Sequence, residues 1–320
     1  MLSLPLFIFL SSALLLVLSG KWVIEALIRV AKYLGWKEFV VAFFTVSLGA
    51  VLPELFVGIS SAIHGIPELS FGNIVGQNIL LLTFTTGICA LLLRGGLEME
   101  SRTVKAGATF AIAAAFLPLL LAINGVLSRI DGIILILFFF LFVTWLFSRK
   151  DQFVKPYDGT EEPSDIPSFG IFLRDIAIIV GGFLLIILSA KGITISANAF
   201  SSAFGLSITA VGLVIVAIGV GIPETYFAVS LAQKGKSWMI LGGLMGSIAV
   251  SSTLVLGTVA LLHPISIENF QPLIFGRIFL VLAALSFLFF VRSKHHVSHR
   301  EAIFLLFLYT LFLLTQIFLG

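Results

Sequence analysis

Two glutamates lie deep inside apolar stretches of this 320-residue chain, and a proline directly precedes each of them. Glu54 belongs to VSLGAVLPELFVGISSAI at 46–63, and Glu224 belongs to VAIGVGIPETYFAVSLA at 216–232. Placing a carboxylate at the centre of a membrane costs about 3 kcal/mol or more, so such residues mark ion or proton sites. The alternative is a glutamate that is hydrogen-bonded to a neighbouring helix. Because two glutamates recur in the same local setting, we favour a cation or proton site.

Each glutamate also follows a predicted break in its helix. Pro53 and Pro223 lack a backbone donor and clash with the preceding turn. Gly49 and Gly219, four residues earlier, offer little resistance to unwinding. Carbonyl groups that are freed at this depth must find partners in protein, water or an ion. We therefore expect helix breaks at Gly49–Pro53 and Gly219–Pro223, each followed by a carboxylate.

The apolar stretches that come next, 72–93 and 239–262, supply neutral oxygen atoms. They begin with the small-xxx-small patterns GNIVG and GGLMG, which allow helices to approach closely. The candidate ligands in and after these patterns are Asn73, Gln77, Asn78, Ser247 and Ser251. Oxygen ligands suit hard cations such as Ca²⁺, Na⁺ and Mg²⁺. An interhelical hydrogen bond is the alternative role for each of these side chains.

The amino-acid composition indicates whether these helices lie in water or in a membrane. Hydrophobic residues make up 59% of the chain, charged residues make up 11%, and the mean hydropathy is +1.16. Soluble domains carry about 25% charged residues. We therefore expect an all-α integral membrane protein. Ten transmembrane helices are predicted, at roughly 3–20, 38–64, 72–93, 104–123, 127–148, 170–190, 207–232, 239–262, 273–292 and 300–319.

The basic residues predict how these helices cross the membrane. Of the 19 Lys and Arg, 16 lie in the loops that follow odd-numbered spans. Loops rich in Lys and Arg stay in the cytoplasm. We therefore expect a multi-pass protein of the cell membrane with both termini outside. The polar loop at 148–168 is then cytoplasmic.

The two glutamate stretches belong to a repeat with a constant offset of 170 residues. At this offset Pro53 and Glu54 align with Pro223 and Glu224, and glycines in the next span also align. The predicted units are a five-helix repeat at 1–147, the linker loop at 148–168 and a second five-helix repeat at 169–320. Because each unit has an odd number of spans, the second one must insert upside down. Inverted-topology repeats are typical of secondary transporters, whose sites lie near the bilayer midplane.

No nucleotide-binding loop or hydrolase motif is present in the sequence. We therefore expect a protein that is not an enzyme and has no cofactor, with transported Ca²⁺, Na⁺ or H⁺ as its ligands. The expected partners are membrane lipid and inorganic cations. The sequence implies neither a nucleic acid nor a protein partner.

The ten spans, the inverted repeat, the paired G-x-x-x-P-E motifs and the G-N-x-x-G motif resemble the calcium/cation antiporter superfamily. The microbial sodium/calcium exchanger branch is the most similar. The resemblance implies that Glu54 and Glu224 are the central cation ligands. It also implies that the backbone carbonyls of Ser47 and Ala217 are ligands at the helix breaks. The long first and sixth helices would slide to switch access to the site.

The chain departs from the family pattern G-T-S-x-P-E at its hydroxyl positions. Ala50 and Val51 stand there in the first repeat, and Val220 and Gly221 stand there in the second. The expected activity is secondary cation antiport by alternating access, with Ca²⁺ or a related cation exchanged for Na⁺ or H⁺. Two alternatives stay open because the neutral oxygen shell is thinner. One is a passive cation channel, and the other is an exchanger fold with a lost or redirected substrate, such as proton-coupled movement of another solute.

Overall fold

The computed structural model describes residues 2–33, 51–98, 102–148, 169–235, 237–267, 270–293 and 296–319. Nearly all of these residues are helical. The α-helices are α1 (Ser3–Tyr33), α3 (Leu52–Ile63), α4 (Glu68–Leu80), α5 (Thr86–Leu92), α6 (Arg102–Leu121), α7 (Arg129–Ser148), α9 (Phe169–Phe204), α10 (Ile208–Val211), α11 (Ala217–Gln233), α12 (Ser237–Val250), α13 (Leu256–Leu262), α14 (Phe270–Ser293) and α15 (His299–Leu319).

Within the described ranges, three π-helical turns interrupt the spans, and a 3-10 turn ends one of them. The π-helical turns are η2 (Leu81–Thr85), η4 (Gly212–Val216) and η5 (Ser251–Val255), and the 3-10 turn is η3 (Ala122–Asn124). η2 and η5 are separated by the 170 residues that separate the two glutamates. The repeat is therefore present in the irregular backbone as well as in the residue types. Turns of this kind are frequent at functional sites.

The repeat also extends to the last helix of each half. Ser128 precedes α7, where its backbone N–H and its hydroxyl both donate to Asp131. Ser298 precedes α15 and donates in the same two ways to Glu301. Both are capping boxes, in which two otherwise unpaired groups at a helix start satisfy each other. The same local device therefore starts the fifth helix of both halves, although the acids differ.

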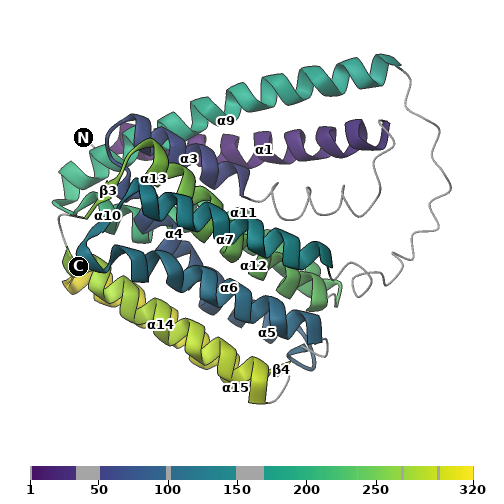
Figure 1. The fold of residues 1–320 in the computed structure, drawn as a ribbon, viewed down its shortest axis with the longest axis vertical. Helices are drawn as coiled ribbons and strands as arrows, with labels where there is room; N and C mark the ends of the chain where they lie inside the picture. Colours follow the sequence, from purple (N-terminus) through teal and green to yellow (C-terminus); the bar gives the residue numbers. More distant parts are fainter. Residues whose placement is uncertain are drawn as a thin grey trace.

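Four short strands show that the two halves are inverted. β1 (Leu97–Glu98) pairs with β4 (His296–Val297), and β2 (Val126–Leu127) pairs with β3 (Ile265–Ser266), both antiparallel. β1 and β3 each follow the third span of their half, yet they belong to different pairs. The third spans of the two halves therefore end on opposite sides of the molecule. The chain termini both lie at the end where β3 lies, and β4 lies at the opposite end (Figure 1).

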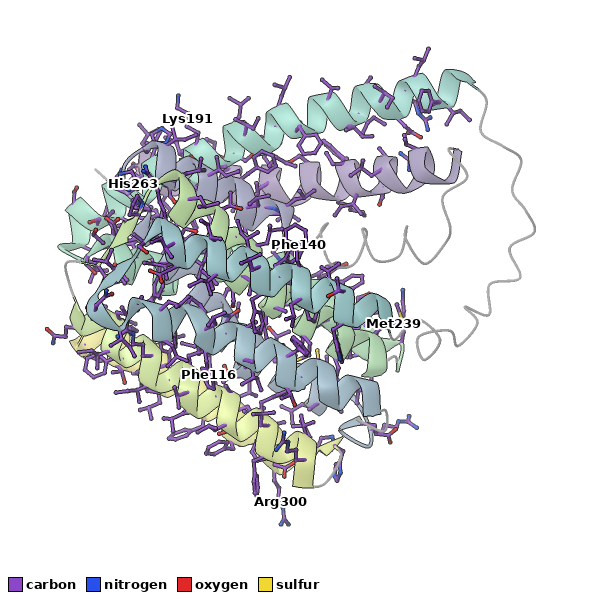
Figure 2. The ribbon with its side chains drawn as sticks, in the orientation of Figure 1. Phe116, Phe140, Lys191, Met239, His263 and Arg300 are labelled. Atoms are coloured by element: carbon purple, nitrogen blue, oxygen red, sulfur yellow. The ribbon has the colours of Figure 1, made fainter. Side chains whose placement is uncertain are left out.

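The helices suit a membrane in length and composition. Among the described residues, eight helical segments are long and apolar enough to cross one, and α3 is a shorter apolar helix. Together with α7 these segments match the ten predicted spans, although residues 38–50 of the second span lie outside the described residues. Large apolar side chains cover the outer surface, such as Phe140 on α7, which is 57% exposed. Figure 2 shows His263 towards the end that holds the termini and Arg300 at the opposite end.

α1 and α9 form a separate pair of long helices along one side of the bundle (Figure 1). Close packing is possible because α9 has glycines where α1 comes nearest. A Cβ atom on Gly182 would lie 2.3 Å from Val23, and one on Gly192 would lie 2.1 Å from Ser12. Near the end of α1, Arg29 donates to both carboxylate oxygens of Asp175 at 2.9–3.1 Å. The two helices are thus joined by small-residue packing and by one bidentate ion pair.

The predicted helix break at Gly219–Pro223 is wrong. α11 runs as a regular α-helix from Ala217 to Gln233 with Pro223 inside it. A proline removes a single hydrogen bond, and packing on a neighbouring helix can hold the remaining turns in place. Gly219 serves that packing, since a Cβ atom there would lie 2.6 Å from the ring of Phe9. The irregular backbone lies one turn earlier, in η4.

The corresponding break in the first repeat is only partly described. Pro53 lies in the first turn of α3, where a missing backbone donor costs nothing because those N–H groups have no helical partner. Gly49 and Ser47 lie outside the described residues. The break at Gly49–Pro53 therefore stays a prediction.

The GNIVG pattern brings α4 against the start of the seventh span. A Cβ atom on Gly76 would lie 2.0 Å from the carbonyl oxygen of Leu213, and one on Gly72 would lie 2.3 Å from that of Thr209. The partner atoms are backbone, so they cannot rotate away. We expect Gly76→Ala to destabilise the protein by about 1–3 kcal/mol, as overpacked cores do. A lowered midpoint of thermal unfolding in detergent measures this effect.

Gly181→Ala on α9 is the matched control, because a Cβ atom there would meet nothing within 4 Å. It should leave the midpoint unchanged or raise it slightly, since Ala is the better helix former. Equal midpoints for the two variants would show that the contact between α4 and η4 is not tight.

Candidate cation site

The side-chain amide of Gln77 joins the two glutamates. Its Nε2 atom donates a hydrogen bond to Oε1 of Glu54 and another, at 2.7 Å, to Oε2 of Glu224. The hydroxyl of Ser247 donates to the other oxygen of Glu224 at 2.5 Å. The two carboxylates therefore face each other across one amide, as their positions in the repeat predict. Glu54 is only 1% exposed, whereas Glu224 is partly buried.

Four different helices position these side chains. Glu54 lies in the first turn of α3, where the N-terminal N–H groups favour a negative charge. Glu224 follows Pro223 inside α11, and Gln77 and Ser247 come from α4 and α12. α4 and α11 contact each other closely. The site thus combines residues from both halves and depends on the packing between them.

The site offers oxygen atoms that have no partner. Glu54 Oε2 and Gln77 Oε1 are buried and make no hydrogen bond in the described part of the chain. Oδ1 of Asn73 and Oδ1 of Asn78 are in the same situation. A buried acceptor without a partner costs about 1–3 kcal/mol. All four are oxygen acceptors, which suits a hard cation such as Ca²⁺.

The other predicted side-chain ligands are Asn78, Ser251 and Asn73. Asn78 donates to the hydroxyl of Ser252 at 2.8 Å, and Ser251 donates to the carbonyl of Ser247 in its own helix at 2.7 Å. Ser251 nevertheless lies beside Glu54. In the described part of the chain the side chain of Asn73 makes no hydrogen bond with either glutamate, and the residue lies on the α4 face that packs against η4. These roles stay predictions.

The two predicted backbone ligands are not both visible. Ala217 is the first residue of α11, and its methyl group packs against Gly76. Because the turns of 217–233 are regular, the structure gives no opened segment that would free its carbonyl. Ser47 lies outside the described residues, so its role stays a prediction.

The sequence did not single out two polar contacts close to the site. One is the partnership of Ser252 with Asn78. The other joins Thr85 and Thr225, whose hydroxyl oxygens are 2.8 Å apart. Neither pair is repeated in the other half, because Leu82 and Val255 stand at the positions that correspond to Ser252 and Thr85. Neither pair can therefore be found by looking for polar residues that recur at the 170-residue offset.

The two halves of the site differ in exposure. Val57 on α3 is fully buried, whereas its counterpart on α11, Phe227, is 52% exposed. Tyr226, next to it, is 75% exposed. The glutamates follow the same trend, since Glu54 is almost fully buried and Glu224 is not. α11 is therefore the more accessible of the two glutamate helices in this structure.

Comparison with known proteins gives the family. The family model described as "Sodium/calcium exchanger protein" matches residues 4–148 and 175–318. The sodium/calcium exchanger MaX1 of Methanosarcina acetivorans is 24% identical over an alignment that covers 100% of both chains. The inner membrane protein YrbG of Escherichia coli is 26% identical over 86% of this chain and 84% of its own.

The fold has solved counterparts. Structures of the sodium-calcium exchanger NCX_Mj superpose with a TM-score of 0.63, covering 98% of this chain and 99% of theirs at 20% identity. At this identity the likeness shows the fold, an exchanger-like arrangement of membrane helices. The family model covers most of both halves. The chain therefore belongs to the sodium/calcium exchanger protein family.

Proposed function

We propose that this chain is a secondary antiporter that exchanges Ca²⁺ or a related cation for Na⁺ or H⁺ by alternating access. The observation that carries the proposal is the convergence of Glu54 and Glu224 on the single amide of Gln77. Cation exchange transport by members of this family supports it. Oε2 of Glu54 and Oε1 of Gln77, which are buried and unpaired in the described part of the chain, fit a hard cation.

The charge of the site explains why exchange is coupled. Two ionised carboxylates within one water-poor site repel each other and are costly to hold in the membrane. Access can therefore switch readily only when cations or protons neutralise them. One Ca²⁺, two Na⁺ or two H⁺ would each do so. The site then returns loaded with the counter-ion, which makes transport an exchange rather than a leak.

The ligand set favours protons as the counter-ion. Ala50, Val51, Val220 and Gly221 provide no hydroxyl groups, so neutral oxygen ligands for several Na⁺ ions are scarce. A proton needs no coordination shell and binds a carboxylate directly. In proteoliposomes, an imposed pH gradient should drive ⁴⁵Ca²⁺ uptake more strongly than a matched Na⁺ gradient. Uptake that follows voltage alone, with no counter-ion, would instead indicate a passive channel.

We further propose that α11 leads from the site to the cytoplasm. By the positive-inside rule, the basic loops favour an orientation with the end that holds β1 and β4 inside the cell and both termini outside, which supports this direction. α11 runs from Glu224 towards the inner end, and Ser230, a partly exposed polar residue on it, would lie along the open path. In the same structure, the buried face of α3 would close the outer path.

Cysteine labelling tests this direction with a pair of residues that the repeat matches. Ser60 and Ser230 occupy corresponding positions, but Ser60 is buried against Thr194 whereas Ser230 is partly exposed. In a Cys89→Ala background, an impermeant maleimide should label Ser230→Cys from the cytoplasmic side, and at least tenfold faster than it labels Ser60→Cys. Faster labelling of Ser60→Cys would contradict the proposed state.

A further inference from the structure

The Gln77 amide occupies the place that a bound cation needs. Its Nε2 atom lies between the two carboxylates and donates to both. The other end of the same amide, Oε1, is buried and has no partner in the described part of the chain. The group thus presents its donor end to the glutamates and leaves its acceptor end unused.

This orientation is incompatible with a cation at the glutamates. An amide nitrogen carries only donors, and an amide oxygen carries only acceptors. A cation between Glu54 and Glu224 would meet the N–H hydrogens of Gln77, which repel it. Half a turn about the last bond of the side chain would replace those hydrogens by Oε1. Torsions of this kind are broad and roughly twofold, so the rotation is inexpensive.

The stem of Gln77 lies beside Gly221, where α4 and α11 meet. It comes from α4, and its Cγ atom lies 3.7 Å from the Cβ position of Gly221 on α11. A side chain at that position would also meet Leu80 at 2.5 Å. The missing side chain of Gly221 therefore makes room for Leu80, next to the glutamine, at a position where the family pattern has a hydroxyl residue.

We propose that Gln77 is an amide switch. In the cation-free site its NH₂ group bridges and partly neutralises the two carboxylates. In the loaded site the amide is reversed, and Oε1 becomes a ligand of the cation beside Glu54 and Glu224. This inference rests on the proposed function, because it requires a cation at the two glutamates. It also gives Gln77 a role in ion selectivity, because a cation must bind the two carboxylates more strongly than the NH₂ group of Gln77 does in order to replace it.

Infrared difference spectroscopy of the purified full-length protein tests the switch. The sample carries ¹³C in the side-chain carbonyl of glutamine, and Ca²⁺ is the added ion. We expect a shift of one glutamine C=O band together with shifts of the carboxylate bands. The glutamine band should vanish in Gln77→Leu. It should persist in Gln316→Leu, because Gln316 is a buried glutamine whose amide donates to Pro272 and also leaves Oε1 unpaired.

The outcomes separate the switch from the proposed function. If the carboxylate bands shift on Ca²⁺ addition while no glutamine band shifts, the switch is wrong and cation binding stands. If neither set of bands shifts, Ca²⁺ does not bind at the glutamates, and both ideas fall. As a second measurement, Gln77→Leu should weaken Ca²⁺ binding at least tenfold. Gln77→Glu, which offers oxygen in either orientation, should bind at least as tightly as the unmodified protein, and weaker binding would contradict the acceptor role.

Discussion

Glu54→Gln and Glu224→Gln should each abolish cation-driven exchange, with Ca²⁺ binding weakened at least a hundredfold. Each change keeps the size of the side chain and removes one of the two charges that face Gln77. Removing one partner from a buried charge arrangement typically costs about 3–5 kcal/mol, and a hundredfold corresponds to about 2.8 kcal/mol. Calorimetric Ca²⁺ titration and ⁴⁵Ca²⁺ uptake into proteoliposomes measure the two effects.

The same variants should be at least as stable as the unmodified protein when no cation is present. Removing one of two facing carboxylates relieves their repulsion, so the unfolding midpoint should stay the same or rise. Loss of transport with a preserved midpoint would separate a functional role from a folding defect. Glu25→Gln is the matched control, because Glu25 lies exposed on α1, 3.9 Å from Lys21. Full exchange by Glu54→Gln would refute the assignment.

Arg29→Met should be the most destabilising single change at the ion pair between α1 and α9. Asp175 has a side chain that is only 2% exposed, whereas the side chain of Arg29 is 37% exposed. Without Arg29, the buried carboxylate loses its bidentate partner, a loss that costs about 3–5 kcal/mol for a buried pair. Asp175→Asn should cost less, because the arginine left behind can reach water.

The double variant Arg29→Met with Asp175→Asn should recover most of the lost stability, since it leaves no charge unpaired. Unfolding midpoints for the four proteins form a thermodynamic cycle. Lys21→Met is the control, because the exposed pair of Lys21 and Glu25 is worth at most about 1 kcal/mol. Additive losses from the two single changes would show that Arg29 and Asp175 do not act as a pair.

The architecture could be predicted from the sequence because the two copies of the repeat share residues that rarely match by chance. A glutamate is rare in a membrane helix, so its recurrence directly after a proline at an offset of 170 is informative in a way that a match of leucine with leucine is not. The structure extends that offset to the π-helical turns η2 and η5 and to the capping boxes at Ser128 and Ser298. The helix caps and the π-helical turns thus follow the same repeat as the residue types, and such agreement is typical of sequences that specify one fold.

The convergence of Glu54 and Glu224 could also be predicted, since inverted repeats place equivalent residues on either side of a common axis. Whether the seventh helix opens at Gly219–Pro223 could not be predicted from the sequence. Proline and glycine in one stretch predict an opened helix from local preferences alone, but tertiary packing decides whether the helix opens. The contact between Gly219 and Phe9 comes from α1, more than 200 residues away in sequence.

The role of Gln77 was out of reach for a related reason. A glutamine near two acids is a candidate ligand by its oxygen, and nothing in a sequence indicates which end of an amide faces inwards. The structure turns the nitrogen towards both carboxylates and leaves the oxygen unpaired. Gly221, which lies beside the stem of Gln77, belongs to the other half of the chain. The residue types predict which side chains are ligands. How those side chains are oriented depends on the packing between the two halves of the chain.

We infer that one cation binds between two acids contributed by the two halves of the chain. Crystals soaked in Sr²⁺, a heavier relative of Ca²⁺, test it most directly through anomalous diffraction. We expect a single strong peak in contact with carboxylate oxygens of both Glu54 and Glu224, and no such peak in crystals of Glu54→Gln. A peak bound to only one of the two acids, or acids that lie apart in the soaked crystal, would contradict it.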